Sequence, residues 1–231
     1  TLPSTVTTLS ERAFADCTGV TSLSLNSGLT TIGTSAFSGC SALTSVTVPN
    51  TVTTIGDTAF TDCTALTAIT IGSGVTTIGT SAFSSTKLTS LTIPNSVTTL
   101  SFSAVNTIAT LTTLVIGNGV TAGIPDSLFY NNKVIASVTM GSAMPSVGNE
   151  AFAGCTALST LALGSSVTTI GTAAFQGCTS LTAVTLPSTV TTLSERAFAD
   201  CTGVTSLSLN SGLTTIGTSA FSGCSALTSV T

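Results

Sequence analysis

The fold of this chain is decided by residues 43–65, LTSVTVPNTVTTIGDTAFTDCTA. The apolar positions of this stretch recur in residues 158–180, and its Phe recurs with the same 23-residue period along most of the chain. A period of 20–50 residues is typical of repeat architectures, in which each repeat buries its apolar face against its neighbours. The chain is therefore predicted to be a solenoid of stacked 23-residue coils.

Each repeat contains two stretches with the pattern of a strand. Residues 43–48 alternate apolar side chains with Ser and Thr, as expected for a strand with one buried face. Pro49 and Asn50 then turn the chain. Residues 52–56 predict a second short extended segment on the other side of the coil. Strands stacked in register would form a parallel sheet.

The last part of the repeat predicts a short helical turn. Ala59, Phe60 and Cys63 have the i, i+1, i+4 spacing that places side chains on one helical face. A glycine recurs just before this turn, and we expect it to adopt a left-handed or tight backbone, which costs glycine least. The recurring glycines are Gly33, Gly56, Gly79, Gly171 and Gly217.

Two columns of side chains are predicted to form ladders along the core. The first column contains Phe14, Phe37, Phe60, Phe83, Phe129, Phe152, Phe175, Phe198 and Phe221, with Val105 as a substitute in the middle. The second column contains Cys17, Cys40, Cys63, Cys155, Cys178, Cys201 and Cys224. A single column does not converge on a point, as a zinc site requires, and its regular spacing differs from a disulfide framework. We therefore interpret these cysteines as buried small apolar side chains with weak S–H donors.

The repeated string V-T-T-I-G-x-x-A-F-x-x-C-x-x-L-x-x-V-T-I-P resembles the BspA-like (Treponema-type) class of leucine-rich repeats in surface proteins. Val52 to Gly56, Ala59 to Phe60, Cys63, Leu66, Ile69 and Ile71 are one instance, and the resemblance covers the whole chain. The resemblance implies a leucine-rich-repeat solenoid with a parallel β-sheet on one face and short extended segments and helical turns on the other. It also implies an extracellular or cell-surface location, and adhesion or host-protein binding.

The sequence also contains a larger repeat that is made of several 23-residue repeats. Residues 1–47 are identical to residues 185–231, and the two copies are offset by eight of the short repeats. Residues 1–231 are thus expected to form a single continuous solenoid of about ten repeats, with residues 1–184 as one super-repeat. Both chain ends fall mid-strand, without an atypical capping repeat. We expect a segment of a longer array, or one protomer of a polymer.

Composition excludes several classes of function. Only 5% of the residues are charged, far below the roughly 25% of typical soluble proteins. Four basic residues against eight acidic ones do not suit nucleic-acid binding, which requires clustered Lys and Arg. No apolar run approaches the roughly 18 residues needed to span a membrane. We expect neither a nucleic-acid partner nor a membrane span.

No catalytic or cofactor motif emerges from the sequence. The chain has no His, which removes the usual general base and the Ser-His and Cys-His pairs. Residues 117–122 match G-x-G-x-x-A by letters, but they lack the βαβ context of a dinucleotide site and are interpreted as a turn. The acidic pairs Glu11/Asp16 and Asp57/Asp62 could bind calcium weakly, although solvated surface charges are the preferred interpretation. We predict no enzyme activity, cofactor or metal.

The middle of the chain departs from the pattern. One residue is missing between Phe83 and Leu88, and one is added between Val120 and Phe129. The only Tyr of the chain follows directly, in the segment Tyr130, Asn131, Asn132 and Lys133. Irregularities in repeat arrays often map to a binding face, so this segment is our candidate contact. The alternative is a drifted repeat without a ligand.

Three functions remain open. The first is an extracellular structural or adhesive role, in which coils or protomers continue the stack into a fibre or surface filament by self-association. The second is an adhesin that binds a host or matrix protein on the concave sheet. The third is binding to ice or to a polysaccharide surface by the Thr and Ser ladders, which contain Thr pairs such as Thr53 and Thr54.

Overall fold

Parallel strand ladders join residues that lie one repeat apart, such as Thr54 with Thr77 and Val46 with Ile69. The computed structural model describes residues 2–231, which divide into unit 1 (up to Val120) and unit 2 (from Thr121). Each unit is a parallel β-solenoid, and the predicted fold class is confirmed. The single continuous solenoid over residues 1–231 stays a prediction, and each unit is described by itself.

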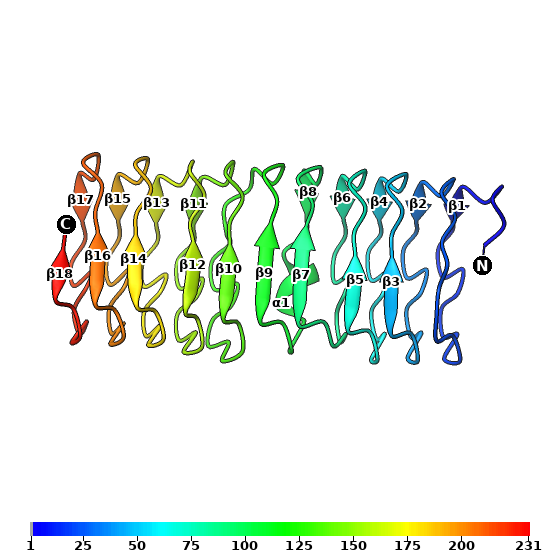
Figure 1. Ribbon diagram of the computed structural model, residues 1–231, viewed down its shortest axis with the longest axis horizontal. Helices are drawn as coiled ribbons and strands as arrows, with labels where there is room; N and C mark the ends of the chain where they lie inside the picture. The colour runs from blue at the N-terminus through cyan, green and yellow to red at the C-terminus, as the bar shows by residue number, and fades with distance from the viewer. Residues whose placement is uncertain (1) are drawn as a thin grey trace. The chain divides into compact units, whose positions relative to one another are not determined.

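In unit 1 one sheet has the strand order β1-β2-β4-β6-β8 (Figure 1). Its strands are β1 (Thr8–Leu9), β2 (Thr31–Ile32), β4 (Thr54–Ile55), β6 (Thr77–Ile78) and β8 (Thr99–Leu100). On the other side of the coils β3 (Ser45–Thr47) pairs with β5 (Ala68–Thr70), and β7 (Ser90–Ile93) pairs with β9 (Thr113–Ile116). Thr77 pairs with Thr99, one position earlier than the regular repeat would give, because the missing residue before Leu88 shortens this coil.

Unit 2 repeats the same arrangement. One sheet has the order β11-β13-β15-β17, formed by β11 (Ser146–Val147), β13 (Thr169–Ile170), β15 (Thr192–Leu193) and β17 (Thr215–Ile216). On the other side β10 (Ser137–Thr139) pairs with β12 (Thr160–Ala162). A three-stranded sheet there contains β14 (Ala183–Thr185), β16 (Ser206–Ser208) and β18 (Ser229–Val230).

Phe rings stack face to face inside each unit. In unit 1 the ring centroids of Phe14, Phe37, Phe60 and Phe83 are separated in turn by 5.5, 5.4 and 6.1 Å. In unit 2 the separations from Phe129 to Phe221 run from 5.0 to 5.6 Å, with rings within 21° of parallel. These separations lie within the range of favourable aromatic pairs, so each ring contributes packing to both neighbouring coils.

The predicted helical turn at the Phe position is wrong. Among the described residues the only helix is α1 (Ser103–Asn106), in the coil where the buried Val105 replaces Phe. In the other coils the backbone N–H groups around the Phe position alternate between two kinds of acceptor. One N–H donates to a carbonyl of its own coil, and the following N–H donates to a carbonyl of the next coil. The N–H of Ala36 donates to the carbonyl of Gly33 at 3.2 Å, whereas the N–H of Phe37 donates to the carbonyl of Ala59 at 2.8 Å. A helix would use all these N–H groups locally and would leave the coils unconnected.

The turns that replace the helix require left-handed residues. In the second coil Ser35 has φ 53° and Gly39 has φ 75°, each as the third residue of a turn closed by an N–H···O=C bond. Equivalent non-glycine residues such as Thr58 and Asp62 also have positive φ, at 51° and 59°. A left-handed non-glycine residue costs about 1–2 kcal/mol, so the inter-coil hydrogen bonds must offset this strain.

The glycines before the turn recur in register for a different reason than predicted. Among the described residues, positive φ occurs in glycine only at Gly39, Gly154, Gly177 and Gly223, so Gly33, Gly56 and Gly79 are not left-handed. A Cβ built on Gly56 would lie 2.7 Å from the carbonyl carbon of Gly33 and from the nitrogen of Thr34. Glycine is needed there because backbones of adjacent coils approach too closely for a side chain.

The cysteines of the predicted column are free thiols, and from Cys40 onward each thiol donates to a carbonyl of the Phe column. The Sγ of Cys63 donates to the carbonyl oxygen of Phe37 at 3.2 Å, and the Sγ of Cys178 donates to that of Phe152 at 3.2 Å. Each of these carbonyls also accepts the N–H of the Cys three residues later in its own coil. Burial is the main cause that raises the pKa of Cys63, Cys155 and Cys201 to about 12, so these thiols stay protonated.

Replacing Gly56 by Ala should destabilise unit 1, because the added methyl group forces two coils apart. Overpacking of this kind typically costs about 1–3 kcal/mol, measured as a lower urea midpoint of unfolding. Gly19→Ala is the matched control, since no atom lies within 4 Å of a Cβ at Gly19. Equal midpoints for the two variants would contradict the close-approach explanation.

Alkaline pH should lower the free energy of unfolding through the buried thiols. Below pH 9 the thiols are protonated in both states, and their contribution to stability is fully present. Above pH 9 they ionise only in the unfolded chain, because their pKa in the folded chain is raised from 9.0 to about 12, so stability falls as pH rises through this window.

The measurement is the urea midpoint between pH 7 and pH 10.5 with a reductant present. The double variant Cys63→Ala and Cys155→Ala should show a shallower alkaline decline than the unsubstituted chain. Comparing slopes with pH separates this effect from the cavity that each Ala leaves. An unchanged slope in the double variant would contradict a role for these thiols.

Candidate binding surfaces

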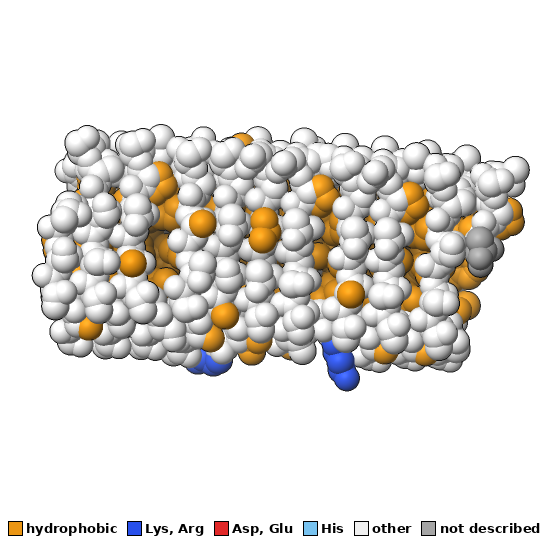
Figure 2. All heavy atoms as spheres, in the orientation of Figure 1, with side chains coloured by type: hydrophobic (Ala, Val, Ile, Leu, Met, Phe, Trp, Pro, Cys, Tyr) orange, Lys and Arg blue, Asp and Glu red, His pale blue; other side chains and the backbone are white. Residues whose placement is uncertain are grey.

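The sheet of unit 1 that contains β3 and β5 exposes a face of small uncharged side chains. Ser45, Thr47, Ala68 and Thr70 are exposed, while Val46 between them is buried. Figure 2 shows this face as mostly white, with hydrophobic atoms visible in furrows between the coils. The alternation follows directly from the strand period of two, because every second side chain points out of the solenoid.

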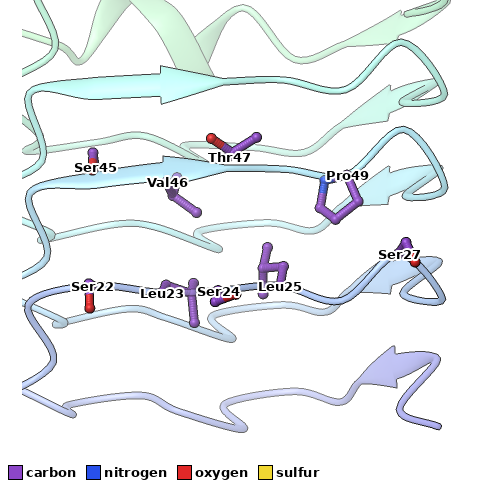
Figure 3. A pocket seen from close by; sticks show the side chains of 9 residues that line it. All are labelled: Ser22, Leu23, Ser24, Leu25, Ser27, Ser45, Val46, Thr47 and Pro49. Atoms are coloured by element: carbon purple, nitrogen blue, oxygen red, sulfur yellow. The ribbon is translucent and has the colours of Figure 1, made fainter. Parts of the chain in front are cut away.

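Two grooves interrupt this face where neighbouring coils are not joined by a strand ladder. Residues 22–25 form no strand beside β3, and a groove of about 410 Å³ lies between these segments (Figure 3). Leu23, Leu25 and Val46 contribute apolar atoms to it, and Ser22 and Ser45 contribute hydroxyls. Every residue that lines this groove is uncharged.

The second groove of unit 1 lies between β5 and β7. Its volume is about 360 Å³, and it is lined by Ile69, Ile71 and Pro94 together with the hydroxyl side chains of Thr70, Ser73, Ser90 and Thr92. Apolar atoms flanked by a few hydroxyls are typical of sites that recognise a partner by shape and hydrogen bonding. These grooves were not predicted, because the sequence pattern alone does not show where a ladder is broken.

The Thr residues directly before β2, β4 and β17 are exposed, and their hydroxyl groups donate to the preceding coil. The Oγ1 of Thr30 donates to the carbonyl of Thr7 at 2.9 Å, and that of Thr53 donates to the carbonyl of Thr30 at 3.2 Å. In unit 2 the Oγ1 of Thr214 donates to the carbonyl of Thr191 at 3.0 Å. These hydroxyls connect coils, so the alternative of ice or polysaccharide binding by the Thr ladders gains no support from them.

The candidate contact segment of unit 2 divides into exposed groups and a local cap. Tyr130 is 54% exposed, and Lys133 Nζ donates to the carbonyl of Gly154 at 2.5 Å and to Asn131 Oδ1 at 3.4 Å. Asn132 Oδ1 instead accepts the N–H groups of residues 134 and 135, at 2.8 and 2.9 Å. The structure therefore brings Tyr130, Asn131 and Lys133 to one surface, whereas Asn132 shapes the backbone.

Five residues near Tyr130 were not predicted from the sequence. Tyr130 and Asn131 share a shallow trough with Ala153, Gly154, Gln176, Gly177 and Asp200. A signal was available, because Tyr130 and Gln176 occupy the same repeat position two coils apart, as do Asn131, Gly154 and Asp200 at intervals of one repeat or two. Reading across columns, and not only along the chain, would have found this set.

One member of each acidic pair considered for calcium has another partner. Arg12 and Asp16 form an exposed ion pair at 3.1 Å, and Asp57 Oδ1 accepts the N–H of Thr80 at 2.6 Å. Within residues 2–231 the structure contains no group of three or more Cys, Asp or Glu side chains placed to hold a metal ion. Over the same residues no helix has the length and apolar character to cross a bilayer.

Comparison with solved structures relates the chain to bacterial proteins. A leucine rich cell surface protein from Faecalibacterium prausnitzii A2-165 shares 29% identity with a TM-score of 0.51, over 99% of this chain and 70% of that chain. A leucine-rich repeat protein from Bacteroides ovatus shares 25% identity with a TM-score of 0.45, over 99% of this chain and 77% of that chain. Comparison with curated proteins yields no match.

The family itself is identified by its sequence profile. The profile of the BspA type leucine rich repeat region, which holds six copies of the repeat, matches residues 1–112 and 122–231. The unmatched gap contains the start of the one-residue insertion before Phe129. The one-repeat register of the strands, the stacked Phe column and this match agree, and the chain belongs to the BspA type family of leucine-rich repeat proteins.

Proposed function

We propose that the chain is a non-enzymatic, extracellular or cell-surface repeat protein that binds a partner protein on the β3–β5 and β7–β9 face of unit 1. The observation that carries the proposal is the pair of uncharged, partly apolar grooves on an otherwise flat hydroxyl surface. The family and the description of the F. prausnitzii relative as a cell surface protein support this location. The non-enzymatic part of the proposal is supported by the absence of His from the sequence. It is also supported by burial of the core thiols, which raises their pKa and disfavours the thiolate that would act as a nucleophile.

The grooves determine the kind of partner. Because no charged residue lines them, the partner is selected by shape, apolar contact and hydroxyl hydrogen bonds, and binding should depend little on salt. Small outward side chains such as Ser45 and Thr70 let a partner approach the backbone closely. Apolar side chains of the partner would fill the grooves as anchors, with the hydroxyl surface around them as a polar rim.

Lysines introduced on this face should weaken binding strongly. The double variant Thr47→Lys and Thr70→Lys places two long charged side chains over the grooves, and we expect the affinity for a bound partner to fall about tenfold or more. The measurement is biolayer interferometry of the 231-residue chain against a panel of purified extracellular-matrix proteins.

The control carries the same added charge on the exposed turns of unit 1, as Thr18→Lys and Thr64→Lys. This variant should keep the affinity of the unsubstituted chain. The proposal fails if no matrix protein binds, or if the two lysine variants bind equally well.

Self-association is a second candidate function, and one observation favours it. Ile216 and Val230 are 52% and 58% exposed, although their columns are buried elsewhere, as at Leu193 and Leu207. A further coil of the same kind would bury them, whether it came from a continuing chain or from a second copy. Coils that stack between copies would build a filament.

Sedimentation velocity tests the stacking of separate copies. The 231-residue chain should associate with rising concentration, and Ile216→Lys with Val230→Lys should keep it monomeric, because charge would be buried at the contact. The variant Thr218→Lys with Ser225→Lys adds equal charge to the same coil at positions whose equivalents in the preceding coil, Glu195 and Thr202, stay exposed, and it should still associate. Monomers of the unsubstituted chain at millimolar concentration would exclude this route to a filament.

A further inference from the structure

A shallow trough of about 290 Å³ lies on the Phe-containing turns of unit 2. Its lining is formed by Ala153 together with Tyr130, Asn131, Gly154, Gln176, Gly177 and Asp200, which come from four successive coils. The trough belongs to the turns, and none of these residues lies in the strands β10 and β12. It is therefore separate in sequence and in unit from the grooves proposed to bind a protein.

The floor of the trough is open at Gly177, the second of two glycines that follow one another in one column. Asn131, Gly154, Gly177 and Asp200 occupy equivalent positions, and all four have positive φ, between 56° and 72°. In unit 1 the same column reads Asp16, Gly39, Asp62, with a single glycine between two acidic side chains. A Cβ built on Gly154 would lie 2.4 Å from Asn131 Oδ1, so the Asn131 side chain covers this glycine. A Cβ built on Gly177 would meet no atom closer than 3.8 Å, so the gap lies over Gly177, between Asn131 and Asp200.

The two ends of the trough have different chemistry. At one end the ring of Tyr130 is 54% exposed, and Lys133 Nζ is held by the carbonyl of Gly154 at 2.5 Å. At the other end Gln176 Nε2 donates to Asp200 Oδ2 at 3.1 Å, which orients an amide and a carboxylate side by side. The amide keeps a second N–H and its oxygen for a ligand, and the carboxylate keeps further acceptor capacity.

We propose that this trough binds a neutral saccharide. An exposed aromatic ring offers a flat apolar surface on which the C–H face of a sugar ring packs. The neighbouring amide and carboxylate accept and donate side by side, which suits adjacent sugar hydroxyl groups that each donate and accept. The open floor at Gly177 lets such a ring lie close to the backbone.

Charge and backbone bonding argue against other ligands. One Lys and one Asp stand at opposite ends, so the trough favours neither an anion nor a cation. The N–H groups of Asn131, Gly154 and Gly177 already donate to the carbonyls of Ala153, Gln176 and Ala199, at 2.7, 2.7 and 2.8 Å. The turns therefore offer no free strand edge on which a peptide could add a strand.

The test is affinity electrophoresis of the 231-residue chain in native gels that contain dextran, xylan, mannan or hydroxyethylcellulose, with polygalacturonate as the charged comparison. At least one neutral polysaccharide should retard the chain. Tyr130→Ala should weaken that retardation about tenfold, the loss typical of truncating a central aromatic contact. Gly177→Asn should abolish it by filling the floor, because a Cβ there meets no atom closer than 3.8 Å and Asn tolerates positive φ.

Ser165→Ala is the control on an exposed part of the same unit and should bind like the unsubstituted chain. Unchanged urea midpoints would show that the trough variants are folded. The proposal is overturned if no neutral polysaccharide retards the chain, or if Tyr130→Ala and Gly177→Asn are retarded as strongly as the control. Because all the substitutions lie in unit 2, this outcome is independent of matrix-protein binding by unit 1.

Discussion

The backbone hydrogen bond between adjacent coils is the interaction on which the rest of the structure depends. Strands of two to four residues find few backbone partners within their own coil, and buried N–H and C=O groups without partners are costly. Each coil therefore takes its partners from its neighbours, as when Thr53 donates to the carbonyl of Thr30 and Phe37 donates to that of Ala59. Because the bonded groups lie one repeat apart, the repeat length must stay nearly constant for equivalent residues to remain in register.

Side chains reinforce the same connection. Thr hydroxyls and Cys thiols both donate to carbonyls of the preceding coil, at 3.2 Å for Thr53 and 3.2 Å for Cys63. Polar side chains, some exposed and some buried, thus connect neighbouring coils. The low charge of the chain follows from this arrangement, since exposed Ser and Thr serve as structural donors and leave few positions for Lys, Arg, Asp or Glu.

The sequence was sufficient to predict the fold and the family, because the same pattern recurs in every repeat and an unclear assignment in one repeat is resolved by the others. It was insufficient for the turns, since the i, i+1, i+4 spacing of Ala59, Phe60 and Cys63 buries the same side chains in a helix and in a series of turns. Left-handed residues such as Ser35 and Thr58 give no compositional signal, because glycine and asparagine are the usual occupants. The role of Gly56 likewise depends on a neighbour in the preceding coil, which a local reading of the chain cannot include.

The candidate binding surfaces lie where the chain departs from its repeat, and the hydrogen bonding between coils explains why. A residue that bonds its coil to both neighbouring coils cannot be substituted without weakening two contacts. Such a column therefore varies little and is poorly suited to recognising a specific ligand. The grooves beside β3 and between β5 and β7 occur where the ladder is interrupted, and the trough occurs where two glycines meet next to the only Tyr. A perfectly regular array would expose the same side chains on every coil, whereas these interruptions give particular coils a surface that differs from the rest.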